Sequence, residues 1–90
     1  MPVQPPDQRV RNFSEVNLGY TPEMALQEAS RCLQCRRRPC VKGCPVGVDI
    51  PGFLRALAKG DFGGALAVIH EENSLPSLCG RACPQEVQCE

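Results

Sequence analysis

The sequence predicts a small all-α domain with about three helices and cysteine-rich loops. Apolar residues recur at helical spacing in three segments, and each segment has residues that favour helix starts or stops at its boundary. No segment alternates apolar and polar residues as a half-buried strand does. The 90 residues include only three Phe, one Tyr and no Trp, so we expect a thin core that the seven cysteines must help to stabilise.

Residues 1–20 are expected to form an extended N-terminal arm, and residues 21–90 a helical domain. Three early prolines and mixed charge disfavour regular structure in the arm. We expect the arm to pack loosely, against a following domain. The side chains expected to anchor it are Val10, Phe13, Val16 and Leu18.

The first helix is predicted to begin at Thr-Pro-Glu, residues 21–23. Threonine is a good N-cap, proline fits the first helical position, and an acid is favourable in the first turn. Leu26, Ala29 and Leu33 then repeat at helical spacing. The C-terminal end of this helix is therefore expected to lie at the first cysteines.

A helical hairpin is predicted next, over residues 50–70. Asp49-Ile50-Pro51 opens its first helix, Gly60 ends that helix, and Asp61 caps the second. Apolar residues recur at i, i+3, i+4 and i+7 in both helices. Beyond residue 73, Pro76 and Pro84 allow at most a short helical turn between them.

The cysteines fall in two groups, and each group contains a Cys-Pro pair. The first reads C-x2-C-x4-C-x3-C-P, and the second reads C-x3-C-P-x4-C. Zinc sites usually separate two ligand pairs by a longer loop, whereas the bacterial ferredoxin run C-x2-C-x2-C-x3-C-P lends its last cysteine to a second cluster. The pattern favours two iron–sulfur clusters that share ligands between the groups, with zinc as the alternative.

Four stretches carry a resemblance to a known family: NFSEVNLGYTPEMALQEASRCLQC, RPCVKGCPVGVDIPGFLRAL, GDFGGALAVI and NSLPSLCGRACPQEVQCE. In this order and spacing they resemble the N-terminal iron–sulfur domain of the glutamate synthase small-subunit family. That family also includes the N-terminal part of dihydropyrimidine dehydrogenase. The resemblance covers residues 11–90 and implies an α-helical ferredoxin-like domain with two [4Fe-4S] clusters and crossed ligation.

The resemblance also implies which thiols bind each cluster. The family continues with a further cysteine, whereas this sequence ends at Glu90. We therefore expect a fragment truncated at its C-terminal end, lacking one ligand for each cluster and able to exist in the apo form. The implied ligands are Cys32, Cys35 and Cys40 for the first cluster and Cys44, Cys83 and Cys89 for the second, while Cys79 is expected to be a buried non-ligand, with ligation by it less favoured.

The function that the resemblance implies is electron transfer. The clusters would relay electrons between FAD and NADPH, held in a following domain, and a second redox centre in a glutamate synthase-type oxidoreductase. The chain has no phosphate-binding glycine motif or catalytic set, so it is not expected to be catalytic alone. The alternative from another class is a zinc-stabilised or apo helical interaction module without a redox role.

Charge and cysteine usage limit the remaining partners. The formal net charge is zero, which gives no indication of nucleic-acid or membrane binding. The sequence shows no signal peptide or bilayer-spanning run, and clustered free thiols are typical of the cytoplasm, where we expect the protein. The basic residues between the first cysteines could tune a cluster, face solvent or dock an acidic partner; Gly43 and Gly47 suit either a close backbone approach or an ordinary turn.

Overall fold

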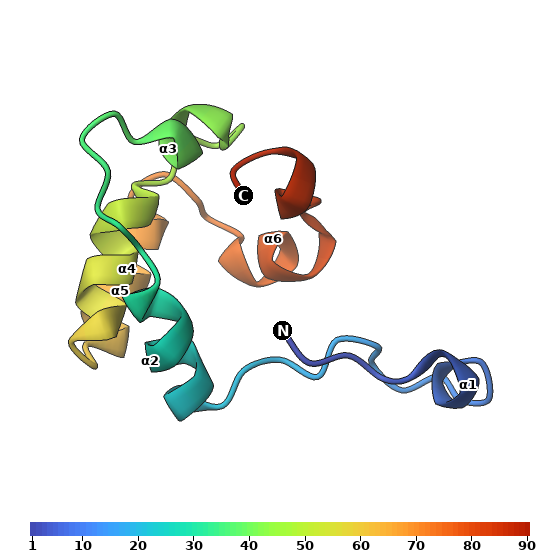
Figure 1. The fold of residues 1–90 in the computed structure, drawn as a ribbon. Helices are drawn as coiled ribbons and strands as arrows, with labels where there is room; N and C mark the ends of the chain where they lie inside the picture. Colours follow the sequence, from blue (N-terminus) through green and yellow to red (C-terminus); the bar gives the residue numbers. More distant parts are fainter.

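The computed structural model describes all 90 residues and is helical apart from one isolated β-bridge (Figure 1). The all-α fold class is confirmed. The three longest helices, of nine residues each, match the three that were expected, and the structure adds three short helices and one 3₁₀ turn. The elements are α1 (Pro6–Arg9), α2 (Pro22–Ser30), α3 (Pro39–Gly43), α4 (Ile50–Ala58), α5 (Phe62–His70), α6 (Pro76–Ala82) and η1 (Gln85–Val87).

The three long helices begin at the caps that the sequence predicted. Thr21, Asp49 and Asp61 each accept a hydrogen bond from the backbone N–H three residues later, at 3.3, 3.2 and 2.8 Å. At the start of α2, backbone and Thr21 hydrogen bonds hold the pKa of Glu23 below its ordinary value. Gly60 ends the first helix of the hairpin with a φ of +80°, which costs a glycine little.

A helical layer forms one side of the molecule. The hairpin helices α4 and α5 pack on each other, α2 packs on α4, and α3 rests against α4 (Figure 1). Only small or medium side chains are buried here, among them Ala29 and Ala65 at 2% and 5% exposed. No large side chain is fully buried, so apolar packing alone gives this chain a thin core.

The C-terminal segment lies opposite this layer. Helix α6, η1 and the chain end face α2 and α3 without extensive helix–helix packing against them (Figure 1). Helix α6 spans seven residues and is therefore longer than the single turn expected between the two prolines. Pro76 at its start explains this, because proline is tolerated in the first turn and Pro84 lies beyond its end.

The N-terminal residues form a projecting hairpin. Leu18 N–H donates to Pro2 and Gln4 N–H donates to Val16, at 2.9 and 2.8 Å, while α1 sits at the tip (Figure 1). The arm gives the chain a radius of gyration of 14.2 Å, against about 12 Å for a compact domain of this length. The expected anchors do not hold it to the helices, since Phe13 is fully exposed and Val10, Val16 and Leu18 are exposed too.

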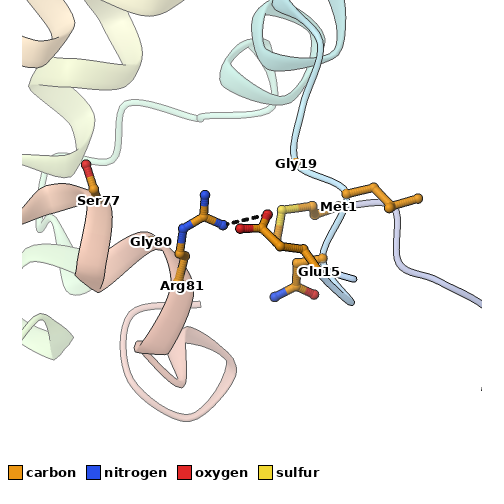
Figure 2. A pocket seen from close by; sticks show the side chains of 8 residues that line it. Met1, Glu15, Gly19, Ser77, Gly80 and Arg81 are labelled. Carbon is orange, nitrogen blue, oxygen red and sulfur yellow. Dashed lines mark hydrogen bonds and ion pairs between the residues drawn. The ribbon is translucent and has the colours of Figure 1, made fainter. Parts of the chain in front are cut away.

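One ion pair joins the arm to α6. Arg81 lies 2.9 Å from Glu15, at the edge of a shallow hollow of about 390 Å³ (Figure 2). Both side chains are largely exposed, so the pair adds at most about 1 kcal/mol to stability. No helix in the chain has the length and apolar character needed to cross a bilayer.

Candidate functional site

A large cavity lies between the helical layer and the C-terminal segment. Its volume is about 1150 Å³, and its lining comes from α2, α3, α4, α6, the base of the arm and the chain end. All seven cysteines are free thiols, and six of them line this cavity. The six are Cys32, Cys40, Cys44, Cys79, Cys83 and Cys89.

Five of the six predicted ligands therefore share one cavity, although they come from segments far apart in sequence. Cys35, the remaining predicted ligand, is exposed and lies outside the lining. Cys79, expected to be a buried non-ligand, lines the cavity and is only partly buried. The ligand assignment stays a prediction.

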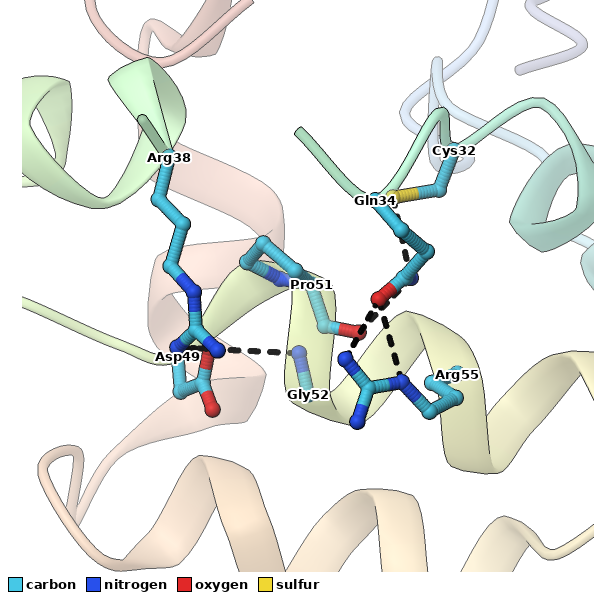
Figure 3. Close-up of polar contacts among 7 residues, drawn as sticks. All are labelled: Cys32, Gln34, Arg38, Asp49, Pro51, Gly52 and Arg55. Atoms are coloured by element: carbon cyan, nitrogen blue, oxygen red, sulfur yellow. Dashed lines mark hydrogen bonds and ion pairs between the residues drawn. The ribbon is translucent and has the colours of Figure 1, made fainter. Parts of the chain in front are cut away.

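The first group of thiols is positioned by α2 and α3. Cys32 follows the end of α2, while Cys40 lies within α3 and Cys44 is its C-cap. Helix α3 was not foreseen because it is short and lies inside the cysteine loop. Its N-cap, Arg38, adopts the left-handed conformation with a φ of +44°, and its guanidinium pairs with Asp49 at 3.0 Å, which ties the loop to the start of α4 (Figure 3).

The loop after α3 stabilises negative charge on Cys44. Burial opposes ionisation of this thiol, but backbone hydrogen bonds from Val48, Val46 and Gly47 outweigh it and lower the pKa of Cys44. Gly47 has a φ of +81° and its N–H donates to the Cys44 carbonyl at 3.0 Å, so this glycine makes the turn after α3. A lowered pKa favours the thiolate, which is the form of cysteine that binds a metal.

The second group is positioned by α6 and the chain end. Cys79 lies within α6, Cys83 is its C-cap, and Cys89 follows η1. The thiol of Cys83 donates to the side-chain oxygen of Gln88 at 3.3 Å. These residues form the wall of the cavity that faces α3.

The two walls of the cavity, one formed by α2 and α3 and the other by α6 and the chain end, meet at Gly43. A Cβ atom at this position would lie 3.0 Å from the carbonyl carbon of Gln88 and 3.3 Å from the Cα of Cys89, with the carbonyl oxygen closer still. The glycine is therefore explained by approach of the opposite wall's backbone, and not by approach of its own N–H to a sulfur. This contact brings the end of α3 against the segment that carries Cys89.

The thiols are close enough to influence one another electrostatically. Burial raises the pKa of Cys89, and negative charge on Cys44 raises it further, with smaller contributions from Cys83 and Cys40. Four sulfurs from two segments thus repel one another when ionised. A positively charged metal centre would relieve this repulsion.

The arrangement suits a large cofactor better than a single ion. No three Cys, His, Asp or Glu side chains converge closely enough to hold one metal ion. The thiols instead surround a cavity into which a cluster with several metal atoms could extend. The donor set of thiols and backbone N–H groups fits an iron–sulfur cluster.

Sequence reasoning missed two residues beside Cys32. Gln34 donates from its side-chain nitrogen to Cys32 Sγ at 3.3 Å and to the Pro51 carbonyl at 3.0 Å (Figure 3). Its oxygen accepts two hydrogen bonds from Arg55, at 3.1 and 2.8 Å. A signal was present, because Arg55 is the only charged residue in the otherwise apolar helix α4.

The basic residues of the cysteine loop do not line the cavity. Arg36, Arg37, Arg38 and Lys42 are all outside its lining, whereas Arg31 and Arg81 belong to it. The cations that line the cavity are therefore Arg31, at the end of α2, and Arg81 in α6.

Comparison with known proteins identifies the domain type. Residues 9–90 match the family model described as dihydropyrimidine dehydrogenase domain II, 4Fe-4S cluster. The chain is 42% identical over 78 residues, 87% of its length, to an NAD-dependent dihydropyrimidine dehydrogenase subunit PreT homolog from Salmonella typhi, of which this region is 19%. It is 39% identical over 87 residues, 97% of its length, to a glutamate synthase [NADPH] small chain from Halomonas elongata, of which this region is 18%.

A second glutamate synthase [NADPH] small chain, from Azospirillum brasilense, is 36% identical over 87 residues. The chain thus spans less than one fifth of the length of these relatives. The family match extends over both cysteine groups and the cavity between them. The chain therefore belongs to the dihydropyrimidine dehydrogenase domain II family of 4Fe-4S cluster domains.

Proposed function

We propose that the chain is an electron-transfer domain with two [4Fe-4S] clusters. The observation that carries the proposal is the cavity, across which two cysteine groups face each other in a chain whose family binds 4Fe-4S clusters. The proposed ligands of the first cluster are Cys32, Cys35 and Cys40, and those of the second are Cys44, Cys83 and Cys89. Two cubanes with four ligands each have eight positions, so two further ligands remain to be identified.

The cysteine residues would hold the cofactor, and the rest of the cavity would tune it. A [4Fe-4S] cluster supplies one-electron transfer when it is bound. The backbone N–H groups of Val46, Gly47 and Val48 stabilise negative charge at Cys44, which favours a bound thiolate over a thiol.

The contact between α3 and the C-terminal segment supports the proposed crossed arrangement of ligands. Cys44 belongs to the first group in sequence, yet the contact at Gly43 brings its end of α3 against the segment of Cys89. The electrostatic interaction between Cys44 and Cys89 supports the proposal that both ligate the same cluster. The Cys-Pro position in a ferredoxin run has the same role.

The proposed partners are a flavin domain and a second redox centre. One relative is named as an NAD-dependent dihydropyrimidine dehydrogenase subunit and another as an NADPH glutamate synthase small chain. We propose that this domain passes electrons between an FAD- and NADPH-binding domain of the same protein and a second redox subunit or domain. It would not be catalytic alone, and it would function in the cytoplasm, where thiols stay reduced.

We also propose a boundary at residue 20, between the N-terminal arm and the helical iron–sulfur domain. Residues 21–90 carry all seven cysteines, whereas the arm carries apolar side chains that face solvent. We propose that the arm packs against a following domain, because its tip is too exposed to contribute to the helical layer.

Anaerobic reconstitution tests the proposal. The protein is loaded with iron and sulfide, and iron, acid-labile sulfide and zinc are measured together with the spectrum of the reduced form. A content near eight irons and eight sulfides per molecule, in protein that carries all the ligands, would support two clusters. Stoichiometric zinc without sulfide would instead favour a structural interaction module and refute electron transfer.

A further inference from the structure

Gln34 occupies an unfavourable backbone conformation between the first two cysteines. Its φ is +50°, in the left-handed region that side-chain-bearing residues rarely adopt. Such a conformation persists where surrounding contacts impose it. At Gln34 these contacts are made by the side chain, which reaches Cys32 on one side and α4 on the other (Figure 3).

The orientation of the Gln34 amide is fixed by Arg55. A guanidinium group can only donate hydrogen bonds, so the amide oxygen must face Arg55. The amide nitrogen then faces the other way, and its two hydrogens reach Cys32 Sγ and the Pro51 carbonyl. Both donors and the oxygen are satisfied, and a flipped amide would place its oxygen against the Pro51 carbonyl and its nitrogen against a cation.

The geometry points to Gln34, held by Arg55, as a positioning and tuning pair for the cluster bound by Cys32. The inference rests on the proposed function. Gln34 donates a hydrogen bond to the ligating sulfur, and Arg55 acts through Gln34 by fixing the amide so that only its N–H can face that sulfur.

The expected effect is on the reduction potential. Reduction adds negative charge that is spread over the iron and sulfur atoms, and a hydrogen-bond donor to a ligating sulfur stabilises the more negative state. The Arg55 guanidinium polarises the amide from behind and strengthens its N–H as a donor. Removal of the donor should therefore make the potential of that cluster more negative.

Gln88 offers a natural contrast at the second group. Its side-chain oxygen accepts from the Cys83 thiol, and no arginine fixes its amide. A cluster-bound Cys83 has no thiol hydrogen, so the Gln88 amide is free to turn. Of these two cysteines, only Cys32 therefore has a side-chain amide N–H that is already oriented toward its sulfur.

The test is a redox titration of anaerobically reconstituted protein that contains this chain and carries all the cluster ligands, in which the reduced clusters are followed by electron paramagnetic resonance. Gln34→Met removes the amide at similar side-chain length, and Gln34→Gly also relieves the left-handed backbone. Arg55→Lys keeps the charge but not the paired hydrogen bonds. Lys59→Met replaces a residue at the end of α4 that makes no hydrogen bond with Gln34, and is the control for a general effect of substitution on this helix.

We expect Gln34→Met and Gln34→Gly to lower the equilibrium constant for reduction of one cluster about tenfold, which corresponds to about 59 mV for one electron. Arg55→Lys should move the same cluster in the same direction, and Lys59→Met should leave it close to the parent. The other cluster should not move in any variant.

The outcomes separate the inference from the proposed function. If protein that carries all the cluster ligands binds zinc, or no iron and sulfide, both are overturned. If the clusters form and both Gln34 variants keep the parent potentials, the pair has only a structural role and the inference alone is refuted. If Gln34→Met fails to fold, the result for Gln34→Gly decides, because that variant removes the backbone strain together with the amide.

Discussion

Substitution of alanine for Gly43 tests how the two walls of the cavity are joined. The added Cβ would lie 3.0 Å from the carbonyl carbon of Gln88, inside ordinary van der Waals contact. The obstruction is backbone, so no side chain can rotate away to relieve it. The segment of Cys89 must instead retreat from the end of α3, by on the order of 1 Å.

The expected change in the free energy of unfolding is a balance of two effects. Alanine favours helix over glycine by up to about 1 kcal/mol, which would stabilise α3. Overpacking of a close contact costs about 1–3 kcal/mol. We expect a net loss of about 1–2 kcal/mol, or a fall of roughly 4–16 °C in the melting temperature for a chain of this size.

The assay compares two glycines in cluster-loaded protein. Gly63 lies inside α5 and outside the cavity, and a Cβ there would meet only Asp61 Oδ1 at 3.9 Å, an ordinary contact, so Gly63→Ala should raise stability by about 0.5–1 kcal/mol. Thermal unfolding followed by circular dichroism measures stability. Transfer of iron to a chelator measures cluster retention, which should fall in Gly43→Ala alone.

Equal or higher stability of Gly43→Ala, with full iron content, would refute this reasoning. It would mean that α3 and the Cys89 segment do not touch as described, and that the cavity is wider than the structure indicates. A loss of stability in both glycine variants would point to a general intolerance of α-carbon substitution rather than to the contact between walls.

Three further predictions follow from individual residues. Cys79→Ser should retain the parent iron and sulfide content while Cys83→Ser loses iron, because only Cys83 is a proposed ligand; equal losses would place Cys79 among the ligands. Thr21→Ala should cost about 1 kcal/mol in thermal unfolding through loss of the α2 cap, with Thr21→Ser near the parent. In the reduced metal-free protein, iodoacetamide should modify Cys44 at lower pH than Cys89, as read by mass spectrometry, because the pKa of Cys44 is lowered and that of Cys89 raised. The reverse order would contradict the N–H contacts at Cys44.

The parts of the fold that were predictable are those specified locally. Thr21, Asp49 and Asp61 each cap a helix with a side chain and an N–H only three residues apart, and Gly60 ends a helix through its own φ. The existence, order and approximate bounds of the long helices follow from such signals. Helix α3 was missed although Pro39 stands at its first position, because it spans only five residues and its N-cap, Arg38, makes no side-chain capping hydrogen bond.

The site was predictable in residue types but not in geometry. Cysteine spacing indicated a metal centre, and the structure gathers six thiols around one cavity. The exposure of Cys35 and the approach of Gln88 to Gly43 depend on contacts between distant segments, which spacing cannot encode. Gln34 and Arg55 are 21 residues apart, so their pairing likewise required the packed helices.

The separation of the two walls along the chain has a consequence for synthesis. Cys44 precedes Cys79 by 35 residues, and at about 5–20 residues per second the first thiols wait roughly 2–7 s on the ribosome before the second group is made. Helices form within about a microsecond, so the hairpin of α4 and α5 that separates the groups can fold during this interval. The number of residues between the two groups of thiols therefore sets the earliest time at which they can meet during synthesis.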